Sequence, residues 1–147
     1  MNMNDPFDFT DFNPAYLAGM ADSDLVPERI CFAGNYDLEQ VIINVNYDCD
    51  LYDYVLVQIN RNEEDIPDYG SCHFLTFDEL ELKEGDQVVV MTNRGKDESY
   101  ERNERSIHVI HWNLATTVWD KGENEVAIME RGNMVIKCLN NSKGTEN

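Results

Sequence analysis

The chain has 147 residues, 42% of them hydrophobic and 27% charged, which is enough for one domain whose core needs no disulfide or metal. Eleven lysines and arginines stand against 29 aspartates and glutamates, so the formal net charge is −18. Such a surface repels phosphate backbones and anionic membranes, which argues against nucleic-acid and membrane partners and favours a protein partner of basic character.

The chain also lacks the usual signals for export and for membrane insertion. Its amino end has no basic stretch followed by an apolar run, and no 18 consecutive residues are apolar. The four cysteines, Cys31, Cys49, Cys72 and Cys138, are widely and irregularly spaced, which is unlike a zinc site. We therefore expect a cytoplasmic protein with free thiols.

Residues 1–28 are predicted to form an acidic N-terminal arm that contains aromatic residues. The arm has six carboxylates and no basic residue, and three prolines interrupt it. Two interpretations are open: a disordered arm, or an arm whose aromatic residues dock on the domain or on a partner. The aromatic residues that would make such an interaction are Phe7, Phe9, Phe12 and Tyr16.

From residue 29 onward, short apolar runs of period two alternate with turn signals, which is typical of an all-β domain. The predicted strands span residues 30–33, 39–46, 51–60, 71–77, 87–92, 106–112, 125–130 and 134–139. A tight turn is expected at 83–86, where Gly85 can supply a positive φ. This pattern predicts an immunoglobulin-like two-sheet β-sandwich of about eight or nine strands over residues 29–140, followed by a flexible tail at 141–147.

Alternation within the strands predicts which side chains face the core. The β-branched sets are expected inside, and both tryptophans are expected to pack in the core. These residues are Val41, Ile43, Val45, Val55, Val57, Ile59, Trp112 and Trp119. Residues 93–105 hold eight charged side chains and are expected to form an exposed, mobile loop.

Several motifs in a fixed order resemble those of the lamin tail domain, an immunoglobulin-like β-sandwich found at the end of nuclear lamins and in many bacterial proteins. Residues 50–56 resemble its D-L-s-G-w-x-L strand, with Asp53 in place of glycine and Tyr54 in place of tryptophan. The remaining motifs fall at 41–45, 77–90, 108–119, 122–128 and 134–136. The resemblance implies a recognition or scaffolding domain without catalytic residues of its own.

Other chemistry was weighed against this interpretation. Asp48, Asp50 and Asp53 crowd one turn and could form a rim that holds Ca²⁺. His108 and His111 fall on opposite faces of a strand and so cannot chelate one metal there. We expect a non-catalytic interaction module without a cofactor, monomeric or weakly self-associating. The alternatives are a calcium- or carbohydrate-binding β-sandwich and an enzyme of unrecognised type, which would show a pocket with convergent titratable groups.

Overall fold

The computed structural model describes residues 23–68, 70–119 and 124–132, and these ranges form an all-β sandwich, as predicted. The strands are β1 (Leu25–Cys31), β2 (Gln40–Val45), β3 (Cys49–Asp50), β4 (Tyr54–Ile59), β5 (His73–Thr76), β6 (Glu81–Leu82), β7 (Gln87–Met91), β8 (Glu98–Arg102), β9 (Arg105–His111) and β10 (Glu125–Glu130). Nothing in this part of the chain forms an apolar helix of membrane-spanning length.

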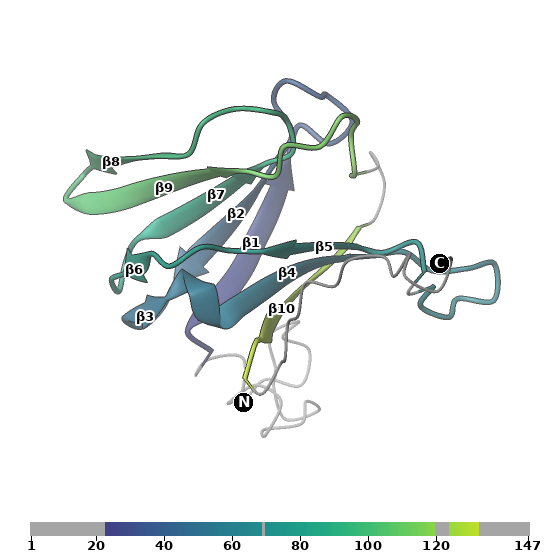
Figure 1. Ribbon diagram of the computed structural model, residues 1–147, viewed down its shortest axis with the longest axis horizontal. Helices are drawn as coiled ribbons and strands as arrows, with labels where there is room; N and C mark the ends of the chain where they lie inside the picture. Colours follow the sequence, from purple (N-terminus) through teal and green to yellow (C-terminus); the bar gives the residue numbers. More distant parts are fainter. Residues whose placement is uncertain (1–22, 69, 120–123, 133–147) are drawn as a thin grey trace, which may run out of the picture.

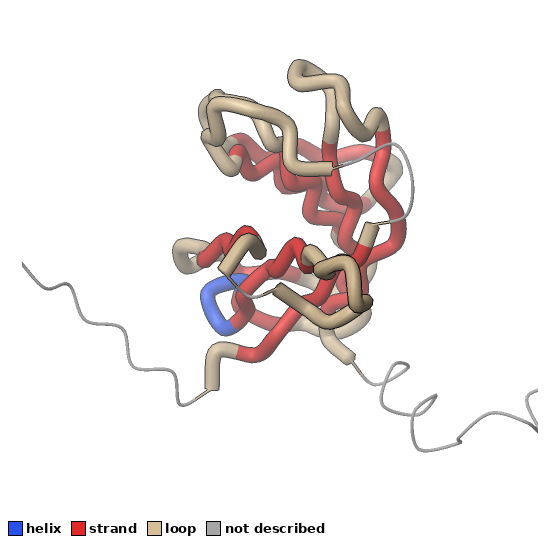
Figure 2. The backbone as a smooth tube through the Cα atoms, turned by 90° about the vertical axis from the view of Figure 1, so that its right-hand side faces the viewer, coloured by secondary structure: helices blue, strands red, loops and turns tan. Residues whose placement is uncertain are grey.

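Two sheets make up the sandwich (Figure 1). One has the strand order β1-β2-β7-β9-β8, the other has the order β10-β4-β5, and β3 and β6 form a small separate ribbon. Figure 2 shows the two sheets as separate layers. All neighbouring strands are antiparallel except β7 and β9, which run parallel. To make this parallel pair, the chain leaves β7, crosses to the outer position as β8, and returns through a hairpin as β9.

The main core lies between the sheets. Val41, Ile43 and Val45 are at most 3% exposed, and Trp112 and Trp119 are also buried, which confirms these inward assignments. A smaller apolar cluster of Ile42, Val89 and Ile107 lies on the outer face of the five-stranded sheet. The central strand β7 supplies side chains to both clusters.

The prediction for β4 is confirmed in part, because Val55 and Val57 are buried, but the main core lies on the other face of the strand. Tyr54 and Leu56 join the core cluster, whereas Val55 and Val57 are buried on the opposite face of the sheet and Ile59 is only partly buried. Apolar residues occupy both faces of this middle strand, so alternation alone did not identify the inner face. The strand also starts later than predicted, because Leu51–Asp53 forms a short 3-10 turn capped by Asp50.

The predicted boundary at residue 28 was also wrong. β1 begins at Leu25, which is 4% exposed and pairs with Val45, and the side chain of Asp24 accepts a hydrogen bond from the Tyr54 hydroxyl. Because proline is unusual within strands, Pro27 argued against a strand here. However, β1 is an edge strand and its register shifts after Pro27, and proline is tolerated at such a position. The predicted arm aromatics Phe7, Phe9, Phe12 and Tyr16, the strand at 134–139 and the tail at 141–147 lie outside the described residues.

The expected loop at 93–105 contains strand β8 and the start of β9. Its side chains are exposed as predicted, but Glu98–Arg102 pairs with β9 along its whole length. Asn103 and Glu104 form the hairpin turn with φ values of 53° and 65°, the left-handed backbone that two-residue hairpins favour. Dense charge on an edge strand protects the sheet from pairing with other chains. The same charge leaves β8 without the apolar alternation from which a strand is predicted.

A buried carboxylate ties three distant segments together at one end of the sandwich. Glu39 is fully buried and accepts hydrogen bonds from the Gly34 amide at 3.0 Å, the Thr92 hydroxyl at 2.6 Å and the Val118 amide at 2.8 Å. These donors satisfy a group that would otherwise be costly to bury.

Candidate functional site

A groove opens between β5 and the β8–β9 edge of the larger sheet, with a cavity of about 550 Å³. The narrower sheet covers the β1 side of the sandwich, where β10 lies against β1, and leaves the β8 side open (Figure 1). The floor of the groove is apolar. Its residues are Leu51, Leu75, Phe77, Leu80, Ile110 and Trp112.

Strand β5 gives this groove an unpaired backbone edge. Within the described residues, β5 pairs only with β4. Leu75 and Thr76 line the cavity directly, and the ring of His73 meets that of Trp112 edge-on, with 6.3 Å between centroids. A strand edge of this kind presents amide and carbonyl groups to whatever occupies the groove.

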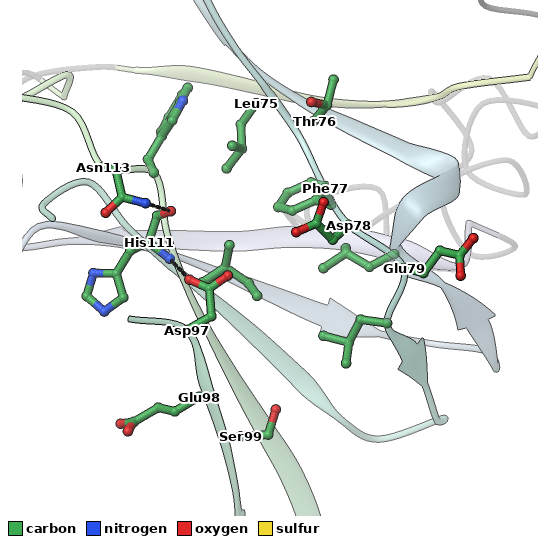
Figure 3. Close-up of a pocket in the computed structure, with 14 residues that line it drawn as sticks. Leu75, Thr76, Phe77, Asp78, Glu79, Asp97, Glu98, Ser99, His111 and Asn113 are labelled. Carbon is green, nitrogen blue, oxygen red and sulfur yellow. Dashed lines mark hydrogen bonds between the residues drawn. The ribbon is translucent and has the colours of Figure 1, made fainter. Parts of the chain in front are cut away.

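Carboxylates mark the rim of the groove (Figure 3). The Asp78 side chain points toward the cavity, whereas those of Glu79 and Glu98 point away from it. Asp78 has no hydrogen bond or ion pair within the described residues, so its charge is available to a ligand. Asp97, on the opposite rim, accepts a hydrogen bond from the His111 amide at 2.7 Å.

The segment that crosses from β7 to β8 is held rigidly against His111. The Gly95 amide donates to Asn113 Oδ1 at 3.0 Å, and His111 Nδ1 lies 3.0 Å from Asn93 Oδ1. A Cβ atom on Gly95 would lie 2.4 Å from His111 Cε1, so only glycine fits this approach. The crossing fixes Asp97 on the rim of the groove.

Beside the groove, Ser99, His108 and Asp86 form a hydrogen-bonded relay. Ser99 Oγ lies 2.7 Å from His108 Nδ1, and His108 Nε2 lies 3.1 Å from Asp86 Oδ2. If Nε2 carries the proton and donates to Asp86, Nδ1 accepts the serine proton, which is the arrangement of a general base. Ser99 is exposed and lines the cavity, while His108 and Asp86 are buried.

Asp86 also has a structural role in this relay. It accepts hydrogen bonds from the Lys83 amide at 3.0 Å and the Ser106 amide at 3.2 Å, which fix the turn before β7. Burial opposes ionisation of this carboxyl, but the hydrogen bonds from Lys83, His108 and Ser106 outweigh it and lower the pKa of Asp86. The sequence analysis placed His108 and His111 on opposite faces of their strand, but it did not predict the two partners of His108, because they come from other segments of the chain.

The three predicted calcium ligands do not converge. Asp48 accepts a hydrogen bond from the Glu84 amide at 2.8 Å, and Asp50 accepts from the Tyr52 and Leu80 amides, each at 3.0 Å. Both carboxylates therefore accept hydrogen bonds from backbone amides and stabilise turns. Among the described residues, no three histidine, cysteine or acidic side chains are grouped so that they could hold a metal ion. Cys31, Cys49 and Cys72 are free thiols, and Cys138 lies outside the described ranges.

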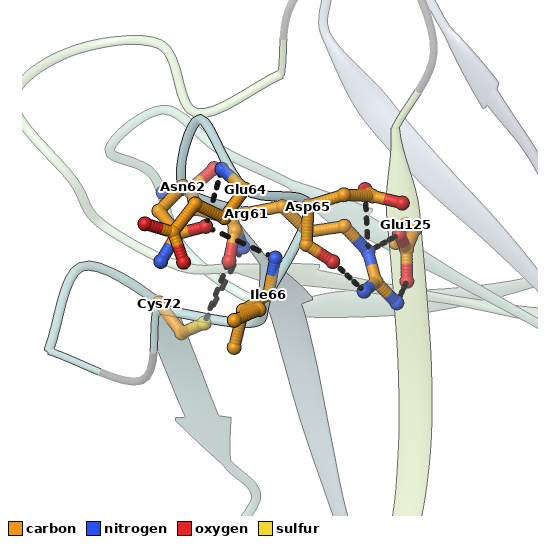
Figure 4. A network of polar contacts seen from close by, with 8 residues as sticks. Arg61, Asn62, Glu64, Asp65, Ile66, Cys72 and Glu125 are labelled. Atoms are coloured by element: carbon orange, nitrogen blue, oxygen red, sulfur yellow. Dashed lines mark hydrogen bonds and ion pairs between the residues drawn. The ribbon is translucent and has the colours of Figure 1, made fainter.

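A separate polar network fastens the loop after β4 to β10 (Figure 4). Arg61 pairs with both carboxylate oxygens of Glu125 and donates to the Asp65 carbonyl at 3.0 Å. Asn62 Oδ1 accepts from the Glu64 and Ile66 amides within the same loop. The hydrogen bond from Arg61 lowers the pKa of Glu125. These groups satisfy one another, so we assign the network to loop structure rather than to binding.

Comparison with family models, with curated proteins and with solved structures found no match to this chain.

Proposed function

We propose that the protein is a non-catalytic interaction module of the lamin-tail type, which binds an extended basic segment of a partner protein in the groove. The observation that carries the proposal is the edge of β5 that has no partner strand among the described residues and that lines an apolar cavity of about 550 Å³. A partner segment added to this edge would gain backbone hydrogen bonds, and its alternate side chains would enter the cavity.

The charges of the groove favour a basic segment. Asp78 and Asp97 stand on opposite rims, so basic side chains that leave the cavity on either side would meet a carboxylate. The net charge of −18 would raise the rate at which a basic partner arrives, an effect that weakens with added salt.

The backbone at Asp53 is compatible with the proposed lamin-tail type. This aspartate replaces a glycine of the family motif, yet it lies in the short turn Leu51–Asp53 and has no positive φ. The substitution therefore introduces no backbone strain.

Selection from a phage-displayed library of random peptides tests the binding proposal. We expect enriched peptides to contain basic residues, and we expect Asp78→Lys to weaken their binding by at least ~10-fold, as loss of a charge-assisted contact would. Glu81→Lys is the matched control, because it makes the same charge change at an exposed position outside the groove. Peptides without a basic bias, or equal binding to Asp78→Lys and the wild type, would refute the proposal.

The Ser99–His108–Asp86 relay favours a second candidate, a hydrolase that acts through Ser99. A fluorophosphonate probe tests it: Ser99 Oγ would bond to phosphorus, fluoride would leave, and His108 Nδ1 would take the serine proton. This candidate requires labelling of the wild type at Ser99 and none in Ser99→Ala or His108→Gln. If the wild type remains unlabelled, the hydrolase is rejected and the interaction module stands.

A further inference from the structure

The outer face of the five-stranded sheet, on the side opposite the groove, has a second hollow of about 310 Å³. Its floor is the smaller apolar cluster of Ile42, Val89 and Ile107. Strands β2, β7 and β9 contribute one floor residue each, so the floor belongs to the rigid middle of the sheet.

Three arginines and a tyrosine surround this floor. They are Arg29, Arg102, Arg105 and Tyr100, and together with the floor residues they define what we call the arginine hollow. The pairing of β8 with β9 places Arg102 directly opposite Arg105 and Tyr100 opposite Ile107. Like charges directly opposite each other on two strands destabilise the pair, so this arrangement has a cost to the fold.

The guanidinium groups of Arg102 and Arg105 lack hydrogen-bond and ion-pair partners within the part of the chain that the structure describes, although the protein has 29 acidic residues. Arg29, by contrast, is paired with Glu28. Two uncompensated guanidiniums beside an apolar floor form a surface that is complementary to carboxylates carried next to apolar groups.

The shape and composition of the hollow select among anionic ligands. A free phosphate would use the guanidiniums but gain nothing from the floor of Ile42, Val89 and Ile107, or from Tyr100, which is 46% exposed. A nucleic acid carries a denser line of negative charge than an acidic peptide with apolar residues between its carboxylates, so it would meet the stronger repulsion from a protein with a net charge of −18. A peptide in which acidic and apolar side chains alternate matches both the floor and the rim, because alternate residues of an extended chain point to opposite sides.

We infer that the arginine hollow is a second binding site, which takes an extended acidic peptide whose carboxylates are interleaved with aromatic or aliphatic side chains. Arg102 and Arg105 bind the carboxylates, and the apolar side chains pack on the floor and against Tyr100. This site is independent of the groove proposed above, since it lies on the other face of the sheet.

Fluorescence anisotropy with a labelled synthetic peptide of alternating glutamate and phenylalanine tests this inference on the full chain. The expected result is saturable binding that weakens at least ~10-fold in the Arg102→Glu/Arg105→Glu double variant. An Arg102→Gln/Arg105→Gln variant should also lose affinity, and Arg94→Glu is the matched control, an exposed arginine outside the hollow. Urea unfolding of each variant checks that the fold is kept, which we expect because these side chains are exposed.

Four results would overturn the inference. The first is absence of binding at low salt, and the second is an equal loss of affinity in Arg94→Glu, which would indicate unspecific attraction. The third is equal binding of a control peptide with glutamine in place of glutamate. The fourth is tighter binding of inorganic phosphate or of single-stranded oligothymidine than of the peptide, which would assign the hollow to a simple anion or to nucleic acid.

Discussion

The two faces of the β8–β9 hairpin differ in chemistry, although they are built from the same short stretch of sequence. The inner face carries Ser99 and Ile110 into the groove, with His108 buried beside it, whereas the outer face carries Tyr100, Arg102 and Arg105 around the arginine hollow. Because successive residues of a strand point to opposite sides, one polar segment contributes to two surfaces of different chemistry. The comparison teaches that an edge hairpin can present two chemically different surfaces without additional structure.

The apolar layers beneath these surfaces differ in size. The inner face of the five-stranded sheet contributes Ile43, Val88 and Val90 to the main core, which also contains both tryptophans. The cluster on the outer face of this sheet has only three buried members. We therefore expect the inner face to determine stability, and the outer face to tolerate change.

The largest effect should come from a matched pair of neighbours in β2. Ile43→Ala should lower the free energy of unfolding by about 2–5 kcal/mol, because it leaves a cavity in the main core. Ile42→Ala, on the outer face, should cost roughly half of that or less, since it packs in a cluster of only three buried residues. Urea unfolding measures both. Equal losses would show that the outer cluster is as tightly enclosed as the core.

The next effect concerns the turn before β7. Asp86→Asn should lower the free energy of unfolding by about 2 kcal/mol at neutral pH, because hydrogen bonds to a charged group are weakened. The pKa of Asp86 is lowered in the folded protein, so its stabilisation is present above the pKa of an unfolded aspartate, about 3.9, and is lost as the pH falls through the folded value.

Urea unfolding at several pH values checks this expectation. The difference between the wild type and Asp86→Asn should shrink as the pH falls below ~4. Asp48→Asn is the control, since Asp48 also accepts a hydrogen bond near this turn but is exposed, and it should cost less. A difference that does not change with pH would contradict the role given to the Asp86 charge.

A smaller effect should appear at the crossing between β7 and β8. Gly95→Ala should cost about 1–2 kcal/mol, because the new Cβ would overlap the ring of His111. The same substitution in a His111→Ala background should be nearly neutral. A double-mutant cycle measures this coupling, and additive losses would show that the ring is not the obstacle.

The smallest effect is a gain. Glu104→Gly should raise the free energy of unfolding by about 0.5 kcal/mol, because glycine tolerates the positive φ of the hairpin turn better than glutamate does. Glu101→Gly removes the same charge from the extended strand β8 and should instead cost about 0.5–1 kcal/mol. Thermal unfolding of both variants gives the comparison, and a loss in Glu104→Gly would show that glutamate makes a compensating contact.

The sequence predicted the all-β class, most of the strands and the inward set Val41, Ile43 and Val45, because these depend on local alternation. The strand prediction failed where local signals conflict with the final environment. Pro27 led to the omission of edge strand β1, and dense charge led to the omission of edge strand β8. In β4, both faces are apolar, so alternation predicted the burial of Val55 and Val57 but not that Tyr54 and Leu56 face the main core.

The candidate sites were harder to predict than the fold. The relay requires the parallel register of β7 and β9, which brings Val88 beside His108 and thereby Asp86 within reach of its ring. The groove and the arginine hollow depend on which strands lie at the sheet edges. Such long-range pairings leave no trace in the spacing of Asp86, Ser99 and His108 along the chain.

The buried carboxylate of Glu39 has a consequence for the order in which the protein is made. One of its donors, Val118, lies 79 residues further along the chain, and the other long-range donor, Thr92, lies 53 residues away. During synthesis, Glu39 therefore cannot form its hydrogen bond with Val118 until most of the chain has left the ribosome. Contacts this distant slow folding, so the sandwich should assemble late and all at once rather than strand by strand.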